Sequence, residues 1–592
     1  MRELPTFLLT AFFFGFCLHI PIFSQQKPNV ILVLTDDQGI GDLGAHGNPW
    51  LKTPNIDAFY EDAVRLTNFH VSPLCTPTRA AIITGRYPIN NGAWATFKGR
   101  DALSNTNTIA DIFKKSGYAT ALFGKWHLGD NYPNRPTDSG FDMAIHHLSG
   151  GIGELSDYWG NDYFDDVYYV NNQPKQFKGY CTDVWFDEAM KFMDSTTNQP
   201  FFVYLPLNAP HDPLFVDEKY ASPYKNLEGT EIIDANLYGM IANIDENFGK
   251  LLRFLENKKL KNNTIVIFMS DNGTRFGYNR DSKLGFNKGF EGIKGSKLEG
   301  GHRAPFFIRW PKGKIEGGRD NNTLAAHIDV LPTLASLCGI LIDDVMAIDG
   351  VDFSSILKKP SLHMPKRTLF LHNRQDWRPP DRAEDVCILQ DEWRLLNQKE
   401  LYDIAKDPKQ EQNLASLYPD KVLELLAAHQ VFMKGAKENP EYRELPSAVI
   451  GSPEQKEIKL TIQHAIGEDL GIWKTEQVAA GVKNLNNTYS LEIIEAGTYR
   501  ISCRRWPKEI EGTIKGFPKN LTDTTLSYLP ISPDKVCIRI ANQILEKEID
   551  VNDIAIDFDV ELHNGKTLLT TEFLESDKNY GVYYTYINRL ED

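Results

Sequence analysis

The sequence predicts an α/β fold in which a large mixed sheet is sandwiched by helices, followed by a small α+β subdomain and a C-terminal β-rich module. Short, continuous apolar runs alternate with helical patterns through residues 28–340. Sheets with two buried faces produce such runs, and helices cover them. After residue 360 the strand-like runs become shorter and one helical pattern follows. Beyond residue 455 the runs are strand-like, which predicts an all-β module.

The elements of the large sheet can be placed in order along the chain. Four apolar runs rich in β-branched and aromatic residues predict buried strands, and helical periodicity lies between them. The predicted strands are residues 30–34, 119–123, 201–205 and 264–269, and the clearest helices are residues 108–115 and 237–250.

The rest of the chain divides into two smaller units. A segment rich in Pro, Glu and Ser, residues 438–457, predicts a linker between them. The subdomain is expected to hold strands at 367–372, 393–397 and 401–402 and a helix at 421–437, and the module to hold strands at 499–503, 536–540 and 580–586.

The composition is that of an ordinary globular protein, with 42% apolar and 24% charged residues among 592. The formal net charge is −15. Nucleic acids and acidic membrane surfaces bind basic protein faces, because cationic side chains release their counterions. The acidic balance therefore argues against nucleic acid as a partner.

The first residues are typical of an export signal. Arg2 precedes an apolar run over residues 7–23, and the small residue Ser24 offers a cleavage position. A membrane anchor is the alternative, but the run is short and Pro21 interrupts it. We therefore expect residues 1–24 to be a signal peptide and the mature protein to be exported, periplasmic or secreted, with no membrane span.

Six cysteines lie beyond the signal segment, and they are widely scattered. No CxxC pair indicates a zinc or thioredoxin-like site, and a chain of this size needs no disulfide framework. One or two disulfides are compatible with the sequence, with Cys503 and Cys537 as the candidate pair.

Each of the four predicted strands of the large sheet is followed by a polar cluster. In open α/β sheets, ligands bind outside the carboxyl ends of the strands, so clusters far apart in sequence can meet at one site. The residues concerned are Asp36 and Asp37, Lys125 and His127, His211, and Asp271 and Asn272.

The segment SPLCTPTRAAIITGRYP, residues 72–88, places Cys75 before Pro77, a residue favoured at the first position of a helix. Arg79 would then lie in the opening turn beside Cys75. A helix N-terminus with an arginine is a natural oxyanion site. For an isolated cysteine in an exported protein, burial or a disulfide would be the more ordinary interpretation.

The pattern Cys75-x-Pro77-x-Arg79, followed by Thr84-Gly85-Arg86, resembles the signature of the sulfatase family, and the resemblance extends over residues 28–440. It implies an alkaline-phosphatase-like fold, with a catalytic domain over residues 28–360, its smaller C-terminal subdomain over 361–440, and an accessory module over 455–592. It also implies that a formylglycine-generating maturation enzyme oxidises Cys75 to Cα-formylglycine (3-oxoalanine), whose hydrated aldehyde is the nucleophile.

The acidic clusters suggest a metal site. Carboxylate and amide oxygens suit a hard divalent cation and suit zinc poorly, although each short acidic pair alone is typical of a turn. The segments LTDDQGIGDLG and SDNGT resemble the calcium motifs of the sulfatase family. The resemblance implies one Ca²⁺ per chain, with Asp36, Asp37, Asp271, Asn272 and modified Cys75 as its ligands.

Two further motifs supply cations and proton donors. The spacing in GKWHLG places Lys125 and His127 on one side of an extended segment, and the pair resembles the lysine-histidine pair of the sulfatases. GIKGSKLEGGHRAP resembles the family's second lysine motif and selects Lys294 rather than Lys297, whereas Arg303 is expected to pair locally. The implied catalytic set is Cys75, Arg79, Lys125, His127, His211 and Lys294, with His302 as a candidate substrate contact.

We therefore expect an exported sulfatase that hydrolyses sulfate monoesters on a sulfated polysaccharide or its oligosaccharides. The aromatic and polar segments at residues 150–169 and 373–385 are candidate specificity loops, or they pack between subdomains. A phosphomonoester or phosphonate hydrolase of the same superfamily and an inactive glycan-binding homologue are the alternatives. The β-module would bind glycan or brace the catalytic domain.

Overall fold

A computed structural model describes residues 27–592, apart from 105, 344–345, 520–525, 577 and 592. The predicted signal peptide, residues 1–24, lies outside the described residues. Within the described ranges, no helix combines the length and the apolar character needed to cross a bilayer.

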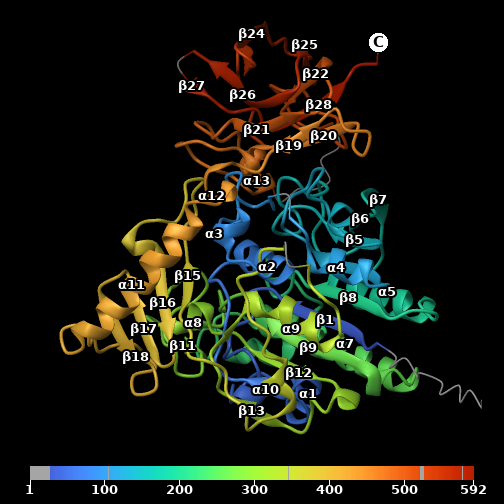
Figure 1. Cartoon of the computed structure of the whole chain (residues 1–592). Coiled ribbons are helices and arrows are strands. Elements are labelled where there is room, and N and C mark those ends of the chain that lie inside the picture. The colour runs from blue at the N-terminus through green and yellow to red at the C-terminus, as the bar shows by residue number, and fades with distance from the viewer. Residues whose placement is uncertain (1–26, 105, 344–345, 520–525, 577, 592) are drawn as a thin grey trace, which may run out of the picture.

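A ten-stranded mixed sheet forms the centre of the larger part of the molecule (Figure 1). The four predicted strands are present, and they lie next to one another in the order β9, β1, β8, β4. All pair in parallel, so their carboxyl ends share one edge. They are β1 (Asn29–Thr35), β4 (Ala119–Lys125), β8 (Phe201–Pro206) and β9 (Thr264–Ser270).

Further strands extend this sheet on both sides, and antiparallel pairs among them make it mixed, as predicted. On one side, β12 pairs antiparallel with β9, and on the other, β5 pairs antiparallel with β6. The added strands are β2 (Val64–Leu66), β5 (Met143–His147), β6 (Val167–Val170), β7 (Gln173–Gln176), β12 (Phe306–Arg309) and β13 (Arg319–Asn321).

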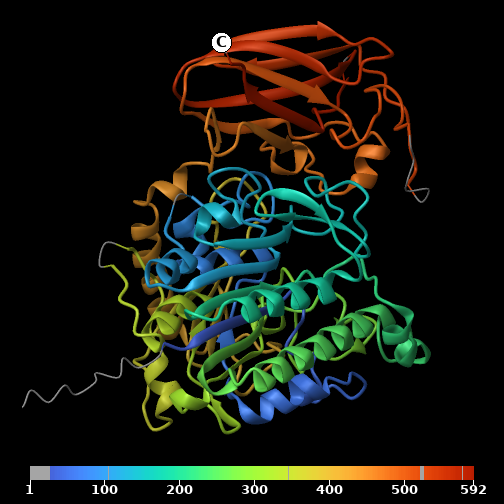
Figure 2. The same cartoon turned by 90° about the vertical axis from the view of Figure 1, so that its right-hand side faces the viewer.

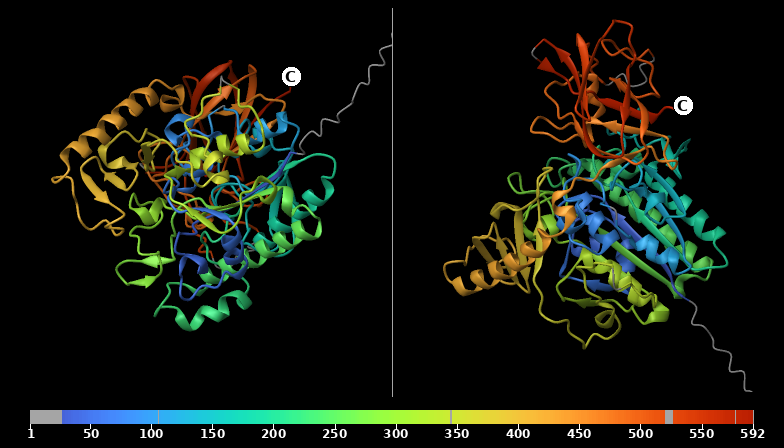
Figure 3. Two further views of the ribbon diagram at one scale, coloured as in Figure 1. Left: turned by 60° about the horizontal axis from the view of Figure 1, so that its bottom comes forward. Right: turned by 45° about the horizontal axis from the view of Figure 1, so that its top comes forward.

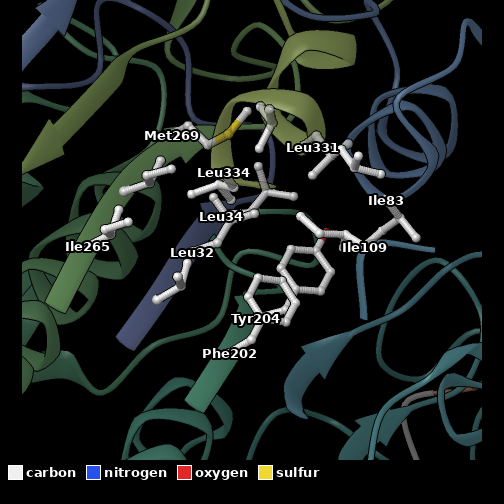
Figure 4. Close-up of a cluster of buried hydrophobic side chains, with 14 of the residues drawn as sticks. Leu32, Leu34, Ile83, Ile109, Phe202, Tyr204, Ile265, Met269, Leu331 and Leu334 are labelled. Carbon is white, nitrogen blue, oxygen red and sulfur yellow. The ribbon is translucent and has the colours of Figure 1, made fainter. Parts of the chain in front are cut away.

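Helices bury both faces of the sheet, which explains the unbroken apolar runs of its central strands. On one face, Leu32 and Leu34 of β1 pack with Ile83 and Leu331 (Figure 4). On the other face, helices α5 and α7 lie across the sheet (Figure 2). The first face is covered by α2 (Cys75–Thr84), α4 (Ile109–Lys115) and α9 (Val330–Leu337), and the second by α1 (Pro54–Asp62), α5 (Cys181–Ser195) and α7 (Ala235–Asn257).

The predicted α+β unit is a four-stranded antiparallel sheet with one long helix against it. Its strands share a hydrophobic core with the helix, so the two form one layer pair. The elements are β15 (Leu369–His372), β16 (Val386–Gln390), β17 (Trp393–Leu396), β18 (Glu400–Asp403) and α11 (Pro419–Ala436).

The C-terminal part is β-rich, as predicted. Two mainly antiparallel sheets share one hydrophobic core and stand beside the larger part of the molecule (Figure 3). One sheet holds β19 (Ala448–Ile450), β21 (Thr488–Ile493), β23 (Lys535–Ile540), β24 (Gln543–Glu548) and β26 (Gly565–Glu575), and the other holds β20 (Glu457–Thr461), β22 (Gly497–Arg504), β25 (Ile556–Leu562) and β28 (Tyr584–Arg589).

Two expectations for this region were wrong. The segment 438–457 is more than a linker, because it contains α12 (Pro440–Arg443) and β19, and β19 pairs with β21 of the module. The candidate disulfide between Cys503 and Cys537 is absent, because both thiols are free. They lie on β22 and β23, which belong to different sheets.

Candidate active site

Helix α2 begins at Cys75, so this side chain stands at a helix N-terminus. Pro77 is the third helical residue, not the first as predicted. Proline is tolerated there because the first backbone N–H groups of a helix have no partner within it. Arg79 follows Cys75 by four residues, and side chains at this spacing share one face of a helix.

Arg79 ties two strand ends together. Its side chain is fully buried, and its Nε and Nη2 donate to Asp271 Oδ2 at 3.0 and 2.8 Å. Its Nη1 donates to the carbonyl of Lys125 at 3.1 Å. Since Asp271 follows β9 and Lys125 ends β4, the guanidinium fixes both tips against α2.

Lys125 forms a second buried ion pair. Its Nζ lies 2.6 Å from Asp36 Oδ2, and neither side chain is exposed. Burial disfavours the charged lysine, but the carboxylate outweighs this effect and raises the pKa of Lys125 above its ordinary value. Lys125 is therefore a fixed positive charge.

Lys294 reaches the same cluster from the loop before α8 (Glu299–His302). Its Nζ lies 2.7 Å from Asp37 Oδ1, and Asn272 Nδ2 donates to the same oxygen at 2.7 Å. Burial opposes the lysine charge, but Asp37 raises the pKa of Lys294. The two predicted lysines thus flank the two predicted aspartates.

The acidic cluster fits a hard cation. Asp36 Oδ1 and Asn272 Oδ1 are buried and have no hydrogen-bond partner in the described part of the chain. Orphaned buried oxygens are costly, and a bound cation would satisfy them. Asp36, Asp37 and His211 also lie close enough to share one ion. The donors are mainly oxygens, which favours a cation such as calcium.

His127 faces Cys75. Its Nδ1 lies 3.5 Å from Cys75 Sγ, and its Nε2 lies 3.0 Å from the carbonyl of Thr96. Because a carbonyl only accepts, the ring proton belongs on Nε2, which leaves Nδ1 as an acceptor. Burial and the charge of Lys125 lower the pKa of His127 to about 4, so the ring is neutral.

The spacing of Lys125 and His127 predicted an extended segment, but the chain is not extended at His127. His127 has a φ of 57°, in the left-handed region. Non-glycine residues rarely adopt this conformation, and it is concentrated at functional sites. Lys125 ends β4, and the turn that follows it, rather than continued strand alternation, directs His127 to the site.

His211 lines the same cavity as Cys75. Its Nδ1 donates to the carbonyl of Asp212 at 2.7 Å, and its Nε2 lies 3.9 Å from Asp37 Oδ2. The backbone contact fixes the ring and leaves Nε2 directed to the acidic cluster.

These side chains meet at a cavity of about 360 Å³. Cys75, His127, His211 and Lys294 line it, whereas Arg79 and Lys125 are fully buried behind them. The structure therefore brings together every predicted catalytic residue and metal ligand.

The predicted contact of His302 with substrate is not what the structure shows. His302 is fully buried, and its ring nitrogens contact His70 Nδ1 and the carbonyl of Lys297. It does not line the cavity. Arg303 pairs locally with Glu299, as expected. Lys297 lies apart from the acidic cluster, and its Nζ donates to the carbonyl of Glu384.

Both candidate specificity loops reach the cavity. Gly150, Ile152 and Asp162 line it from the first, and Gln375 lines it from the second. The first loop also packs between units, because its Leu155 and Trp159 belong to the core of the C-terminal module. The structure therefore confirms that the first loop packs between units, and its role in specificity stays a prediction.

Several lining residues were not predicted. Asp212 and Arg275 sit beside recognised motifs, so their position gave a signal. Phe97 lies near no motif that the sequence analysis singled out. Gln463, Trp473 and Lys474 come from the C-terminal module, and no local pattern places them at a cavity in another unit.

The sulfatase family description matches residues 28–340, which is more than half of the chain. The chain belongs to the sulfatase family. A second description, "N-sulphoglucosamine sulphohydrolase, C-terminal", matches residues 294–430. These matches include both the acidic cluster and the helix that begins at Cys75.

Curated relatives include the N-acetylgalactosamine-6-sulfatase of Mus musculus, which is 31% identical over 57% of this chain and 67% of its own length. An arylsulfatase of Hemicentrotus pulcherrimus is 32% identical over 57% of this chain and 62% of its own. This sulfatase therefore spans about two thirds of the length of these relatives.

Solved structures share the fold. Ps i-CgsB in complex with k-i-k-neocarrahexaose has a TM-score of 0.61 and 26% identity, covering 71% of this chain and 94% of that one. BT4656 in complex with D-glucosamine-2-N,6-O-disulfate has a TM-score of 0.58 and 20% identity, covering 71% of this chain and all of that one (100%).

Proposed function

We propose that this sulfatase is an exported sulfuric ester hydrolase that removes sulfate from a sulfated polysaccharide or its oligosaccharides. One observation carries the proposal. Cys75 begins a buried helix and lines a cavity beside which two lysines, an arginine and two histidines meet an acidic cluster. A sulfate ester needs this combination, since its cleavage builds negative charge on oxygen.

Each side chain of the site has a separate role in the proposed reaction. Lys294, which lines the cavity, would bind the sulfate oxygens, and the buried charge of Lys125 behind it would help to stabilise the negative charge that develops on them. His211, held by the carbonyl of Asp212, would protonate the departing sugar oxygen, an effect worth about 10²–10⁴-fold. His127 would accept a proton from a hydroxyl group at residue 75 through Nδ1. Arg79 would orient residue 75 from the buried side.

Two groups complete this assignment. Formylglycine, made from Cys75 by a maturation enzyme, supplies a nucleophilic hydroxyl when hydrated. Asp36, Asp37, Asp271, Asn272 and residue 75 would hold calcium, which would supply positive charge at the acidic cluster. The unpartnered oxygens of Asp36 and Asn272 support the second part.

A sulfated carbohydrate is the substrate class that the relatives support. One curated relative is named for N-acetylgalactosamine 6-sulfate, and one structural neighbour is described with a neocarrahexaose. The signal-like N-terminal segment supports export. An exported enzyme would meet such polymers outside the cytoplasm. Aromatic residues at the cavity, including Phe97 and Trp473, are suited to sugar faces.

The test is sulfate release by protein made together with a formylglycine-generating enzyme. Peptide mapping around residue 75 would first establish conversion of the thiol. The substrates are 4-nitrophenyl sulfate, N-acetylgalactosamine 6-sulfate and carrageenan oligosaccharides, with 4-nitrophenyl phosphate as the comparison. We expect sulfate release that is lost in Cys75→Ala.

Other outcomes would contradict the proposal. A preference for the phosphate ester would indicate a phosphomonoesterase. Glycan binding without any sulfate release by fully converted protein would indicate an inactive homologue. Equal activity in protein whose Cys75 remains a thiol would exclude the formylglycine.

A further inference from the structure

The loop that follows β5 is joined edge to edge with the C-terminal module. Leu155 N–H donates to the carbonyl of Trp473 at 3.0 Å, and Glu154 and Lys474 pair as an antiparallel bridge. The hydroxyl of Thr475 donates to the carbonyl of Gly153 at 3.4 Å. Two of these contacts use only backbone atoms at residues 473 and 474, so they do not depend on the side chains there.

Buried side chains strengthen this junction. Leu155 is fully buried in the module core, and the rings of Trp159 and Trp506 lie 5.6 Å apart. Gln463 of the module is 2% exposed, and its Nε2 donates to Glu154 Oε2 at 2.9 Å. Figure 1 shows α13 (Thr475–Ala479) at the base of the module, against the larger part of the molecule. The contacts fix the module relative to the cavity.

Trp473 is the aromatic residue that the module contributes to the cavity. It is 39% exposed, lines the same cavity as Cys75, and its ring centroid lies 5.7 Å from that of Phe97. The two ring planes are inclined at 42° to each other, and both rings present aromatic surface to the cavity, which Ile152 and Phe215 also line. Such a surface suits the apolar face of a sugar ring.

The charges around Trp473 favour a neutral ring over a second anion. Lys474 Nζ and Arg275 Nη1 lie 4.0 and 2.8 Å from the two carboxylate oxygens of Asp212. Glu154, Asp162 and Glu476 also line the cavity. The acidic groups at least balance these cations, so this part of the cavity has no net positive field. Its charged side chains can still form hydrogen bonds with the hydroxyl groups of a sugar.

We propose that Trp473 is the platform of a subsite for the sugar that adjoins the sulfated sugar of an oligosaccharide. This inference rests on the proposed sulfatase function and names the part of the substrate that the module recognises. The module is then a wall of the active site that determines specificity, instead of a separate domain or a brace.

The experiment compares wild type with Trp473→Ala, Trp473→Phe and Phe517→Ala in formylglycine-containing protein. Phe517 is the matched control, because it is an aromatic residue of the module, 44% exposed, that does not line the cavity. Sulfate release is measured for 4-nitrophenyl sulfate and for matched mono- and tetrasaccharide sulfates from chondroitin sulfate, heparan sulfate and carrageenan. Thermal unfolding of each variant monitors the fold.

We expect the wild type to prefer a tetrasaccharide to its matched monosaccharide. Trp473→Ala should lower the ratio of kcat/KM for the tetrasaccharide to kcat/KM for 4-nitrophenyl sulfate about tenfold, the scale of aromatic stacking. Trp473→Phe should restore most of that ratio, and Phe517→Ala should leave it unchanged.

Other results would overturn the inference. An unchanged kcat/KM ratio in Trp473→Ala would contradict the proposed subsite. Equal kcat/KM of the wild type for mono- and tetrasaccharides would contradict it as well. A parallel fall for all substrates together with a lower unfolding midpoint would mean that Trp473 only braces the junction. No sulfate release from any compound by the wild type would instead overturn the proposed function, and the subsite with it.

Discussion

Arg79 and Asp271 form a buried, charge-assisted pair in which two guanidinium nitrogens, at 3.0 and 2.8 Å, share the carboxylate oxygen Oδ2. Neither side chain is exposed. The pair links the helix that begins at Cys75 to the end of β9, so it couples the position of residue 75 to the acidic cluster.

Replacing Arg79 with Met should strongly destabilise the protein. The change leaves the Asp271 carboxylate buried without its partner, a situation that costs about 3–5 kcal/mol of unfolding free energy. Urea unfolding measures the loss. Arg500→Met is the control, because Arg500 forms a similar pair with Asp559 on the exposed surface of the module, where no measurable change is expected. Equal effects of the two substitutions would contradict the role assigned to burial.

Calcium should stabilise the folded protein through the acidic cluster. A ligand that binds only the folded state adds about 2.7 kcal/mol at a concentration 100 times its dissociation constant. We expect added Ca²⁺ to raise the unfolding midpoint of protein pretreated with a chelator, and Asp37→Ala to abolish the shift. The same shift in both proteins would place the ion elsewhere, and no shift in the wild type would contradict the metal site.

Replacing Gly150 with Ala should displace His127 and slow turnover. A Cβ at residue 150 would lie 2.5 Å from Cε1 of the His127 ring, closer than packed atoms approach. Because a small misplacement of a catalytic group can cost about 10²-fold in rate, we expect a marked fall in kcat. Gly435→Ala serves as the control, since open space surrounds Gly435 in α11. A normal kcat in Gly150→Ala would show that His127 tolerates the shift.

The junction between the catalytic domain and the module should respond to pH through His464. Its Nε2 lies 3.4 Å from Asp130 Oδ2 and 3.6 Å from Asp101 Oδ2. Burial disfavours the imidazolium, but the two carboxylates outweigh this effect and raise the pKa of His464 above its ordinary value of 6.5. A group whose pKa is higher in the folded state stabilises fully below its unfolded pKa.

The contribution of His464 is therefore present below about pH 6.5 and disappears as the pH rises through the folded-state pKa. The measurement is the unfolding midpoint of wild type and His464→Gln between about pH 5.5 and 9. We expect the wild type to have a higher unfolding midpoint than His464→Gln at the acidic end of this range. The difference between the two midpoints should narrow as the pH rises. A difference that stays constant or widens would show that His464 is not charged in the folded protein.

The sequence was informative where function depends on strand ends. Four apolar runs predicted β1, β4, β8 and β9, and parallel pairing of neighbours then brings their polar ends to one edge. Asp37 and Lys294 are far apart in the chain, yet their side chains meet at 2.7 Å. Periodicity and resemblance to the sulfatases together therefore predicted the residues that meet at the acidic cluster, but not those that the C-terminal module adds to the cavity.

Local patterns failed where a residue's surroundings come from distant segments. The position of His302 beside the second lysine motif made it a candidate substrate contact, but the side chain is fully buried and contacts His70. The spacing of Lys125 and His127 suggested an extended segment, whereas His127 adopts a left-handed conformation. A short peptide of this composition has no preference that would predict either result, because tertiary contacts impose both.

By itself, the sequence determined the kind of chemistry: a cysteine at a helix start, hard oxygen ligands and fixed cations, each attached to an element with strong local periodicity. Only the tertiary structure decided which surfaces enclose that chemistry. The C-terminal module brings Trp473 to the cavity through contacts with a loop more than three hundred residues earlier in the chain. Such contacts arise from the shape and burial of whole units, and no window of neighbouring residues encodes them.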